Sequence, residues 1–200
     1  VTSDGGRITA VADDTAPSAG ATPLAGLTVP GFANAHSHAF HRALRSRVQA
    51  ERGTFWTWRD TMYRAAEHLD PERYHRLGRA VFAEMAQAGI AVVGEFHSVH
   101  HQPSGAPYRD AIAMGVALMA AATDVGIRIT LLDTLYLHGA LDDRGYAPVD
   151  GMQRRFADGD VDRWVQRVAD LEPAASQRVG AAIHSVRAVD PDAMARVAEW

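Results

Sequence analysis

Apolar residues along this chain follow two alternating patterns. Four continuous apolar runs are typical of strands buried on both faces, and these runs cover residues 27–35, 90–97, 127–137 and 179–184. Between and after them, apolar residues recur at spacings of three and four, which predicts helices over residues 71–88, 112–125 and 161–171 and from residue 190 onward. Strand and helix therefore alternate four times, which predicts an α/β fold with a parallel sheet built from β-α-β units.

Residues that cap helices support these boundaries. Asp70 is a suitable N-cap, and Pro71 fits the first helical position, where no backbone N–H is needed. Gly89 and Gly126 follow the first two predicted helices, where a left-handed glycine commonly ends a helix. Asp190 precedes a proline in the same way as Asp70 does, and this marks the start of the last helix.

Two stretches of the chain lack these patterns. The first thirty residues are mostly small and polar, with strand-like pieces only at residues 7–11 and 26–29, and they cannot form a core alone. Residues 139–160 are rich in Gly, Asp and Pro, and we interpret them as a long strand-to-helix connection that could act as a lid.

Every predicted strand delivers histidine at its C-terminal end. The histidines at these four ends are His36 and His38, His97, His138 and His184. In a (β/α)₈ barrel such ends meet on one face, where active sites are built, and in a doubly wound open sheet they line a crevice. Both folds therefore predict a functional site here.

His36 and His38 form the most informative pair. Because side chains two residues apart on a strand point the same way, both imidazoles would face one site. Two imidazoles are half of a four-ligand site for a divalent metal, with zinc or iron favoured by nitrogen donors. The alternative is a coincidental pair in a turn, with both rings hydrogen-bonded to the backbone. The apolar strand directly before the pair favours the metal.

Composition narrows the class of protein. The 200 residues carry a net charge of −4 with 47% hydrophobic residues, and no apolar run reaches the length of a transmembrane helix. We therefore expect neither a membrane protein nor a nucleic-acid binder, but a protein of the cytoplasm that acts on small molecules. Because the chain has no cysteine, it can have no disulfide, no thiolate zinc site and no cysteine nucleophile.

The residues from Pro30 to His38, with the sequence PGFANAHSH, resemble the first barrel strand of the amidohydrolase superfamily of metal-dependent hydrolases and deaminases. Within it, the segments FWTWR at 55–59, EFH at 95–97 and HSVRAV at 184–189 resemble formimidoylglutamate deiminases. This resemblance implies a distorted, TIM-like (β/α)₈ barrel beside a small β-sandwich. It implies that residues 1–27 are the incomplete edge of the sandwich and residues 28–200 are the first half of the catalytic barrel.

The resemblance also implies roles for single residues. His36 and His38 would be metal ligands, and Arg59, His184 and Arg187 would hold the carboxylates of the substrate. A guanidinium suits that task because it can bind a carboxylate through two hydrogen bonds. From the residues alone, Arg187 could instead be a solvated charge or a helix cap, and Arg59 could simply stack on the neighbouring aromatic rings.

Two positions near the implied substrate site depart from the family pattern. The family usually has glutamine where His41 stands and tyrosine where Ser98 stands. His41 can still donate a hydrogen bond, whereas Ser98 is too short to reach as far as a tyrosine. These departures bear on which substrate is bound rather than on the class of reaction.

The implied reaction is the metal-dependent hydrolysis of N-formimidoyl-L-glutamate to N-formyl-L-glutamate and ammonia in histidine degradation. It would need one divalent metal, zinc first and iron as the alternative, a small dicarboxylate substrate and a homodimer of the full-length enzyme. In the family, the further ligands and the general acid/base come from strands five to eight. We expect these groups beyond Trp200, so the fragment alone should be inactive.

Two other functions stay open. One is another deaminase of the same superfamily, guanine- or triazine-like, which has no reason to keep Arg59 and Arg187. The other is a non-catalytic module that binds an anionic metabolite without a metal.

The remaining polar residues receive structural interpretations. We expect His97 to line or support the pocket, His138 to contact the site or the lid, and Asp133 to make a structural hydrogen bond. His100 and His101 lie in a loop and are expected to be solvent-exposed. The methionines at helical spacing, Met85, Met114 and Met119, are expected to fill the core.

Overall fold

The computed structural model describes residues 1–5, 7–13, 15–48 and 53–200, which form two compact units, Val1–Pro30 and Gly31–Trp200. The first unit contains one antiparallel pair, β1 (Thr2–Asp4) and β2 (Arg7–Ala10). The strand expected near residues 7–11 is therefore present, whereas the strand expected at 26–29 is not. Membership of these residues in a β-sandwich stays a prediction.

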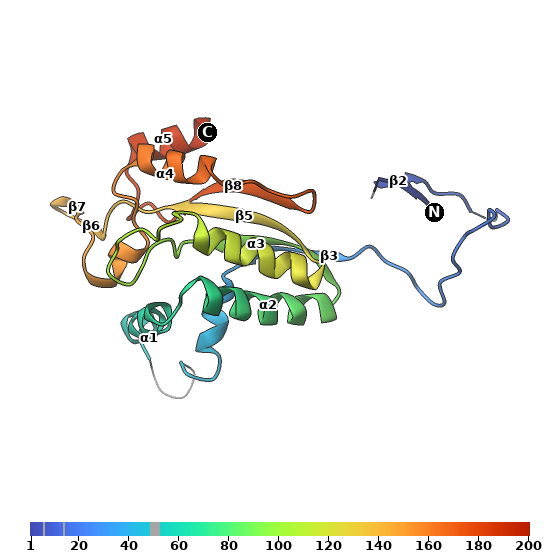
Figure 1. The fold of residues 1–200 in the computed structure, drawn as a ribbon, viewed down its shortest axis with the longest axis horizontal. Coiled ribbons are helices and arrows are strands. Elements are labelled where there is room, and N and C mark those ends of the chain that lie inside the picture. Colours follow the sequence, from blue (N-terminus) through green and yellow to red (C-terminus); the bar gives the residue numbers. More distant parts are fainter. Residues whose placement is uncertain (6, 14, 49–52) are drawn as a thin grey trace. The chain divides into compact units, whose positions relative to one another are not determined.

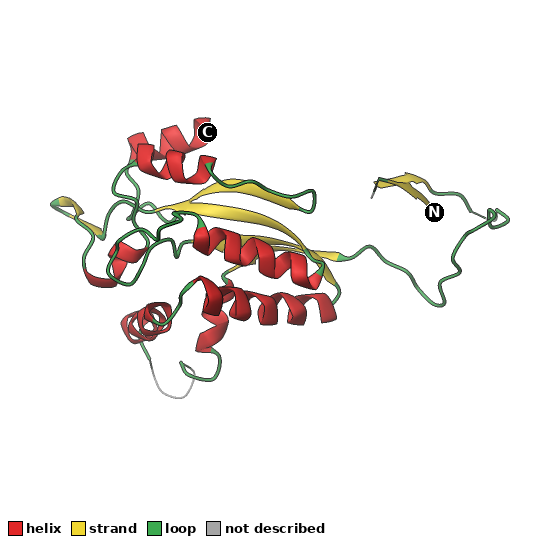
Figure 2. Ribbon diagram, viewed as in Figure 1, coloured by secondary structure: helices red, strands yellow, loops and turns green. Residues whose placement is uncertain are grey.

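The second unit is built on a parallel sheet of four strands (Figures 1 and 2). These strands lie in the order β3 (Phe32–Ser37), β4 (Ile90–His97), β5 (Arg128–Leu135) and β8 (Gln177–Ile183). All four predicted strands are present and run parallel, each joined to the next by a connection that contains a helix. The predicted α/β class is confirmed, and all four C-terminal strand ends lie at one edge.

Helices cover the sheet where the sequence predicts them. The structure has α2 (Pro71–Gln87), α3 (Ala113–Val125), α4 (Val161–Ala169) and α5 (Pro191–Glu199). Helices α2 and α3 pack side by side against one face (Figure 1). Gly78 allows close packing of the two helices, because a Cβ there would lie only 2.8 Å from Leu118 Cδ2. Met114 and Met119 are buried as expected, and Met85 packs at the rim of the core. No helix in the described ranges is long and apolar enough to cross a membrane.

Strand β3 is not the buried strand that its apolar residues predict. Only Ser37 is buried, and Phe32 is 62% exposed. The physical reason is that β3 is an edge strand of this sheet, paired with β4 alone, so its apolar residues lack a neighbour on the other side.

Several short elements are absent from the sequence-based prediction. A 3₁₀ helix, η1 (Ala39–Leu44), follows β3, and α1 (Phe55–Glu67) follows it in the chain. Helix α1 begins with a capping box of Thr54 and Thr57. The expected lid stretch of residues 139–160 contains a hairpin of β6 (Ala140–Asp142) and β7 (Gly145–Ala147), and then a second 3₁₀ helix, η2 (Gly151–Arg155).

A buried network of ionic hydrogen bonds ties α4 to the sheet. Arg167 donates to both carboxylate oxygens of Asp133 at 2.9 Å and to both of Asp158 at 2.7 and 2.8 Å. Trp164 donates to Asp133 as well, at 3.0 Å. Burial by itself would raise the pKa of both carboxyl groups. His100 and then Arg167 lower the pKa of Asp133, and Arg167 and then His101 lower that of Asp158, so that both lie below the usual range. The structural role expected for Asp133 is thus confirmed.

Replacing Arg167 with methionine would leave Asp133 and Asp158 buried without their cation. We expect the free energy of unfolding to fall by about 3–5 kcal/mol, because the buried carboxylates would then have neither a cation nor water to stabilise their charge. Urea unfolding followed by circular dichroism measures this change. Arg163→Met is the matched control, since Arg163 is exposed one turn earlier on the same helix, and it should cost less than about 1 kcal/mol. Equal losses in both variants would contradict this account of the network.

Candidate functional site

A cavity of about 400 Å³ lies at the C-terminal ends of the parallel strands. All seven residues that the sequence singles out for metal or substrate line it: His36, His38, His41, Arg59, Ser98, His184 and Arg187. They come from β3 and η1, from α1, and from the segments that follow β4 and β8. The fold therefore gathers into one site residues that are distant in sequence, while their roles stay predictions.

His36 and His38 face the cavity from the end of β3. Their ring centroids lie 5.0 Å apart with the rings edge to face, as the two-residue repeat of a strand requires. Burial, with a smaller effect of His36, lowers the pKa of His38 below its usual value. His38 is therefore neutral near pH 7, and the neutral imidazole is the form that binds a metal ion.

Two further imidazoles surround this pair. His41 from η1 stacks on His38 with centroids 4.8 Å apart, and the ring of Phe96 separates His38 from His184. Burial lowers the pKa of His41 to about 4, and His38 and His184 contribute. Burial also lowers the pKa of His184 to about 4, with smaller effects of Arg187 and His38. The cavity thus holds neutral imidazoles beside permanent positive charge.

That positive charge comes from two arginines. Arg59 lies on α1, and its guanidinium carbon is 4.5 Å from the ring centroid of Trp56 and 5.5 Å from that of Tyr63. Its Nε is buried and has no hydrogen-bond partner among the described residues. Arg187 lies in the turn after β8 and is exposed. Both guanidinium groups line the cavity, so a ligand with acidic groups would find hydrogen-bond donors there.

Sequence reasoning missed several residues that complete the wall. Those not singled out as site residues include Phe40, Phe55, Trp58, Met62, Tyr63, Phe96, Tyr136, Gly139, Gln153, Phe156 and Ser185. Strand alternation could have found one of them, because Phe96 is two residues before Ser98. Burial raises the pKa of the Tyr136 phenol to about 12, so it stays a hydrogen-bond donor. Among the described residues, no Asp or Glu lines this cavity.

Glu95 supports the histidine strand from the opposite face of the sheet. It is fully buried on β4, pairs in register with Ser37, and accepts a hydrogen bond from the Ala39 N–H at 2.6 Å. Ser37 and Ala39 flank His38, so this carboxyl group fixes the backbone that carries the predicted metal ligand. Burial raises the pKa of Glu95 to about 7, while hydrogen bonds from Ser37 and Ala39 lower it to a smaller extent.

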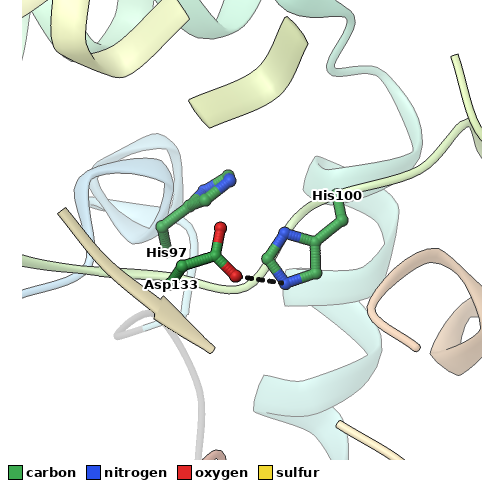
Figure 3. A group of neighbouring side chains, drawn as sticks. All are labelled: His97, His100 and Asp133. Carbon is green, nitrogen blue, oxygen red and sulfur yellow. Dashed lines mark ion pairs between the residues drawn. The ribbon is translucent and has the colours of Figure 1, made fainter. Parts of the chain in front are cut away.

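A second group of titratable side chains, drawn in Figure 3, lies outside the cavity lining. It consists of His97, His100 and Asp133, whose potential ligand atoms all lie within 4.8 Å of one another. All three are buried, and His97 contacts the Tyr74 hydroxyl of α2 at 3.4 Å. Both oxygens of Asp133 already accept hydrogen bonds from Arg167. This adjacent cation makes the group a poor metal site and a good structural network.

Two histidine expectations need correction, and a third is narrowed. His100 and His101 are 1% and 7% exposed rather than solvent-exposed. Their backbone N–H groups donate to the Arg155 carbonyl, and their rings contact Thr134 and Asp158, which holds them inside. Of the two roles expected for His97, it does not line the cavity, because strand alternation turns it toward α2 and α3, and a supporting role stays a prediction.

His138 also lies outside the cavity lining, so only two of the four strand ends bring their histidines into the site. Its ring stacks on Tyr146 of the β6–β7 hairpin, with centroids 4.4 Å apart. The expected contact with the lid segment is therefore present.

Comparison with known proteins gives one family and several relatives. The model of the amidohydrolase family matches residues 27–199. The formimidoylglutamate deiminase of Pseudomonas aeruginosa is 38% identical over 183 residues, which is 89% of this chain and 40% of the relative. An amidohydrolase from Brucella melitensis superimposes with a TM-score of 0.78 at 36% identity, over 86% of this chain and 39% of the other.

A more distant solved structure carries a metal. The atrazine chlorohydrolase TrzN of Arthrobacter aurescens, complexed with zinc, has a TM-score of 0.65 and 25% identity over 85% of this chain and 38% of the other. The chain therefore spans about two fifths of the length of these relatives. Its sheet and helices fit the N-terminal part of their common fold.

Glu95 should make the stability of the metal-free protein depend on pH. A glutamate whose pKa rises from 4.5 to about 7 on folding contributes stability that is fully present below pH 4.5 and is lost as pH rises through 7. The stability of Glu95→Gln relative to the wild type should therefore increase as pH rises over this range, by at most about 1.4 kcal/mol per pH unit. Urea unfolding with a chelator from pH 4.5 to 8 tests this. Glu67→Gln, at an exposed position, should keep the wild-type pH dependence, and an unchanged dependence in Glu95→Gln would refute the prediction.

Proposed function

The chain belongs to the amidohydrolase family, and we propose that the enzyme containing it hydrolyses the amidine bond of N-formimidoyl-L-glutamate to give N-formyl-L-glutamate and ammonia. The observation that carries the proposal is one cavity with paired histidines on one side and two arginines on the other. The identity to a relative named formimidoylglutamate deiminase supports the same substrate.

His36 and His38 would hold the metal ion. They fit that role because both rings come from one rigid strand, face one cavity and lie 5.0 Å apart, and because burial keeps His38 neutral. Zinc is our first assignment, with iron as the alternative, since imidazole nitrogens suit both. A bound zinc ion supplies Lewis acidity, which activates water at neutral pH and polarises the bond under attack.

Arg59, His184 and Arg187 would bind the acidic end of the substrate. A guanidinium can bind a carboxylate through two parallel hydrogen bonds, and neutral His184 can add a third donor. Aromatic side chains around Arg59 exclude water and strengthen such a bond. These residues thus select a dicarboxylate and orient its amidine end toward the histidines.

His41 and Ser98 would contact the substrate between these two ends. His41 is neutral, so it can donate from one ring nitrogen and accept at the other. Ser98 presents a short hydroxyl beside Phe96 and leaves room in the cavity. Both residues would tune which small dicarboxylate fits best.

Proton transfer to the departing nitrogen needs a general acid/base. Since the cavity lining contains no Asp or Glu among the described residues, we assign that group and the further metal ligands to parts of the enzyme beyond Trp200. We accordingly propose that these 200 residues are inactive alone. A cytoplasmic homodimer of the full-length enzyme completes the proposal.

The likeness to a triazine-acting structure favours one alternative, a deaminase or related hydrolase for nitrogen-containing aromatic rings. Such a substrate carries no carboxylates and would leave both arginines without a partner, which is costly for Arg59 because its Nε is buried. A non-catalytic module that binds an anionic metabolite would need the arginines but not the paired histidines.

Metal binding should depend on the paired histidines. In the full-length enzyme, His36→Asn and His38→Asn should each weaken zinc affinity by more than about 100-fold, because each removes a ligand rather than a supporting group. Elemental analysis after dialysis against graded chelator concentrations measures this. His68→Asn, at the exposed end of α1, should keep full zinc content. Stoichiometric zinc in both cavity variants would reject these residues as ligands.

Substrate preference separates the candidate functions. The full-length enzyme should release ammonia from N-formimidoyl-L-glutamate at least 100-fold more efficiently than from guanine or an aminotriazine. Arg187→Met should lower kcat/KM for N-formimidoyl-L-glutamate by about 10- to 100-fold, because a hydrogen bond to a charged group contributes about 1.5–3 kcal/mol. Coupled detection of ammonia measures both. Preference for an aromatic ring would favour the alternative, and turnover by the 200-residue chain would refute the proposed location of the general acid/base.

A further inference from the structure

The position of the Arg187 guanidinium depends on the backbone turn that carries it. No hydrogen bond or ion pair holds its guanidinium to another group of the described residues, and the residue is exposed, although it lines the cavity. A long side chain without such contacts explores many rotamers. The positions that the guanidinium can reach are therefore limited mainly by the rigidity of the turn of residues 185–189.

Hydrogen bonds from the end of β5 hold the C-terminal half of this turn. The backbone N–H groups of Leu137 and His138 both donate to the Ala188 carbonyl, at 2.8 and 2.9 Å. The His138 ring also contacts Asp190, the N-cap of α5, at 3.0 Å. These bonds fix the part of the turn that follows Arg187.

Tyr146 bonds to the backbone on both sides of Arg187 in the chain. Its hydroxyl group lies 3.1 Å from the Val186 carbonyl oxygen and 3.2 Å from the Val189 carbonyl oxygen, and it donates to this pair. Tyr146 belongs to β7, and its ring stacks on His138 at 4.4 Å. The β6–β7 hairpin therefore reaches the arginine turn through a single phenol.

The hairpin is itself anchored at the rim of the cavity. The Gly139 N–H donates to the Ala147 carbonyl at 2.9 Å, and Gln153 donates to the Gly139 carbonyl at 2.9 Å. A Cβ on residue 139 would lie 2.5 Å from Gln153 Oε1 and 2.6 Å from the Pro148 carbonyl, so only glycine fits this anchor. A firm anchor at its base allows the hairpin to act as a brace.

We propose that Tyr146 is a positioning residue for Arg187, so that the β6–β7 hairpin helps to select substrates with an acidic group. The inference rests on the proposed function, because it assigns Arg187 to the carboxylate end of the substrate. Tyr146 itself does not line the cavity. It acts by restricting the turn, which reduces the ordering that Arg187 must undergo when a carboxylate binds.

The test is a double-mutant cycle in the full-length enzyme. Tyr146→Phe keeps the ring and removes the hydroxyl, and it should raise KM for N-formimidoyl-L-glutamate about tenfold while kcat changes less than twofold. Combined with Arg187→Met, the same substitution should add no further change, because the residue through which it acts is gone. Arg144→Ala at the exposed hairpin tip is the matched control and should leave KM unchanged. Equal effects of Tyr146→Phe in both backgrounds would overturn the proposal.

Two readouts do not depend on turnover. Tyr146→Phe should speed amide hydrogen exchange at Leu137 and His138 about tenfold, and it should weaken binding of glutarate, an unreactive dicarboxylate, by a similar factor in calorimetry. If the wild type binds glutarate but releases no ammonia from N-formimidoyl-L-glutamate, the proposed reaction fails while the positioning role stands. If exchange and glutarate binding both match the wild type in Tyr146→Phe, the positioning role fails whatever the reaction.

Discussion

The two-residue repeat of parallel strands is the constraint on which this site depends. On β3 it sends His36 and His38 into the cavity and Ser37 toward Glu95. At the end of β4 it sends Ser98 into the same cavity, but turns His97 toward the helices. A shift of one residue in β4 would exchange the two sets and place the buried Glu95 carboxyl group on the side where the substrate is proposed to bind.

Because of this alternation, the face behind the cavity carries polar groups that must be satisfied internally. Asp133, Asp158 and Arg167 form one such network, and Glu95 forms another with the backbone of the histidine strand. Arg155 links this layer to the cavity wall, since its buried guanidinium donates to the carbonyl of Ala66 in the last turn of α1 and to that of Leu69 just after this helix. The same η2 segment presents Gln153 to the cavity.

Apolar runs and apolar residues at spacings of three and four allowed prediction of all four parallel strands and of the helices between them. Of the seven predicted site residues that line the cavity, the strand ends indicated His36, His38 and His184, whereas Arg59, Arg187, His41 and Ser98 came from the resemblance to a known family. Helix α1 was not predicted, because its aromatic residues line the cavity and do not form a continuous apolar face that packs on the core. His100 and His101 were expected in solvent, since nothing local shows that the Arg155 carbonyl, far along the chain, accepts from both. Long-range polar partners of this kind leave no periodic signal.

The position of Arg155 has an evolutionary consequence. Ser98 and His41 contact the cavity without belonging to the buried ionic networks, so either can change during divergence at little cost to the fold. Gln153 is different, because it lies two residues before Arg155 and shares its short helix. A lineage that remodels this segment to accept a new substrate must keep the arginine in place, so the wall around residues 151–155 should diversify more slowly than positions 41 and 98.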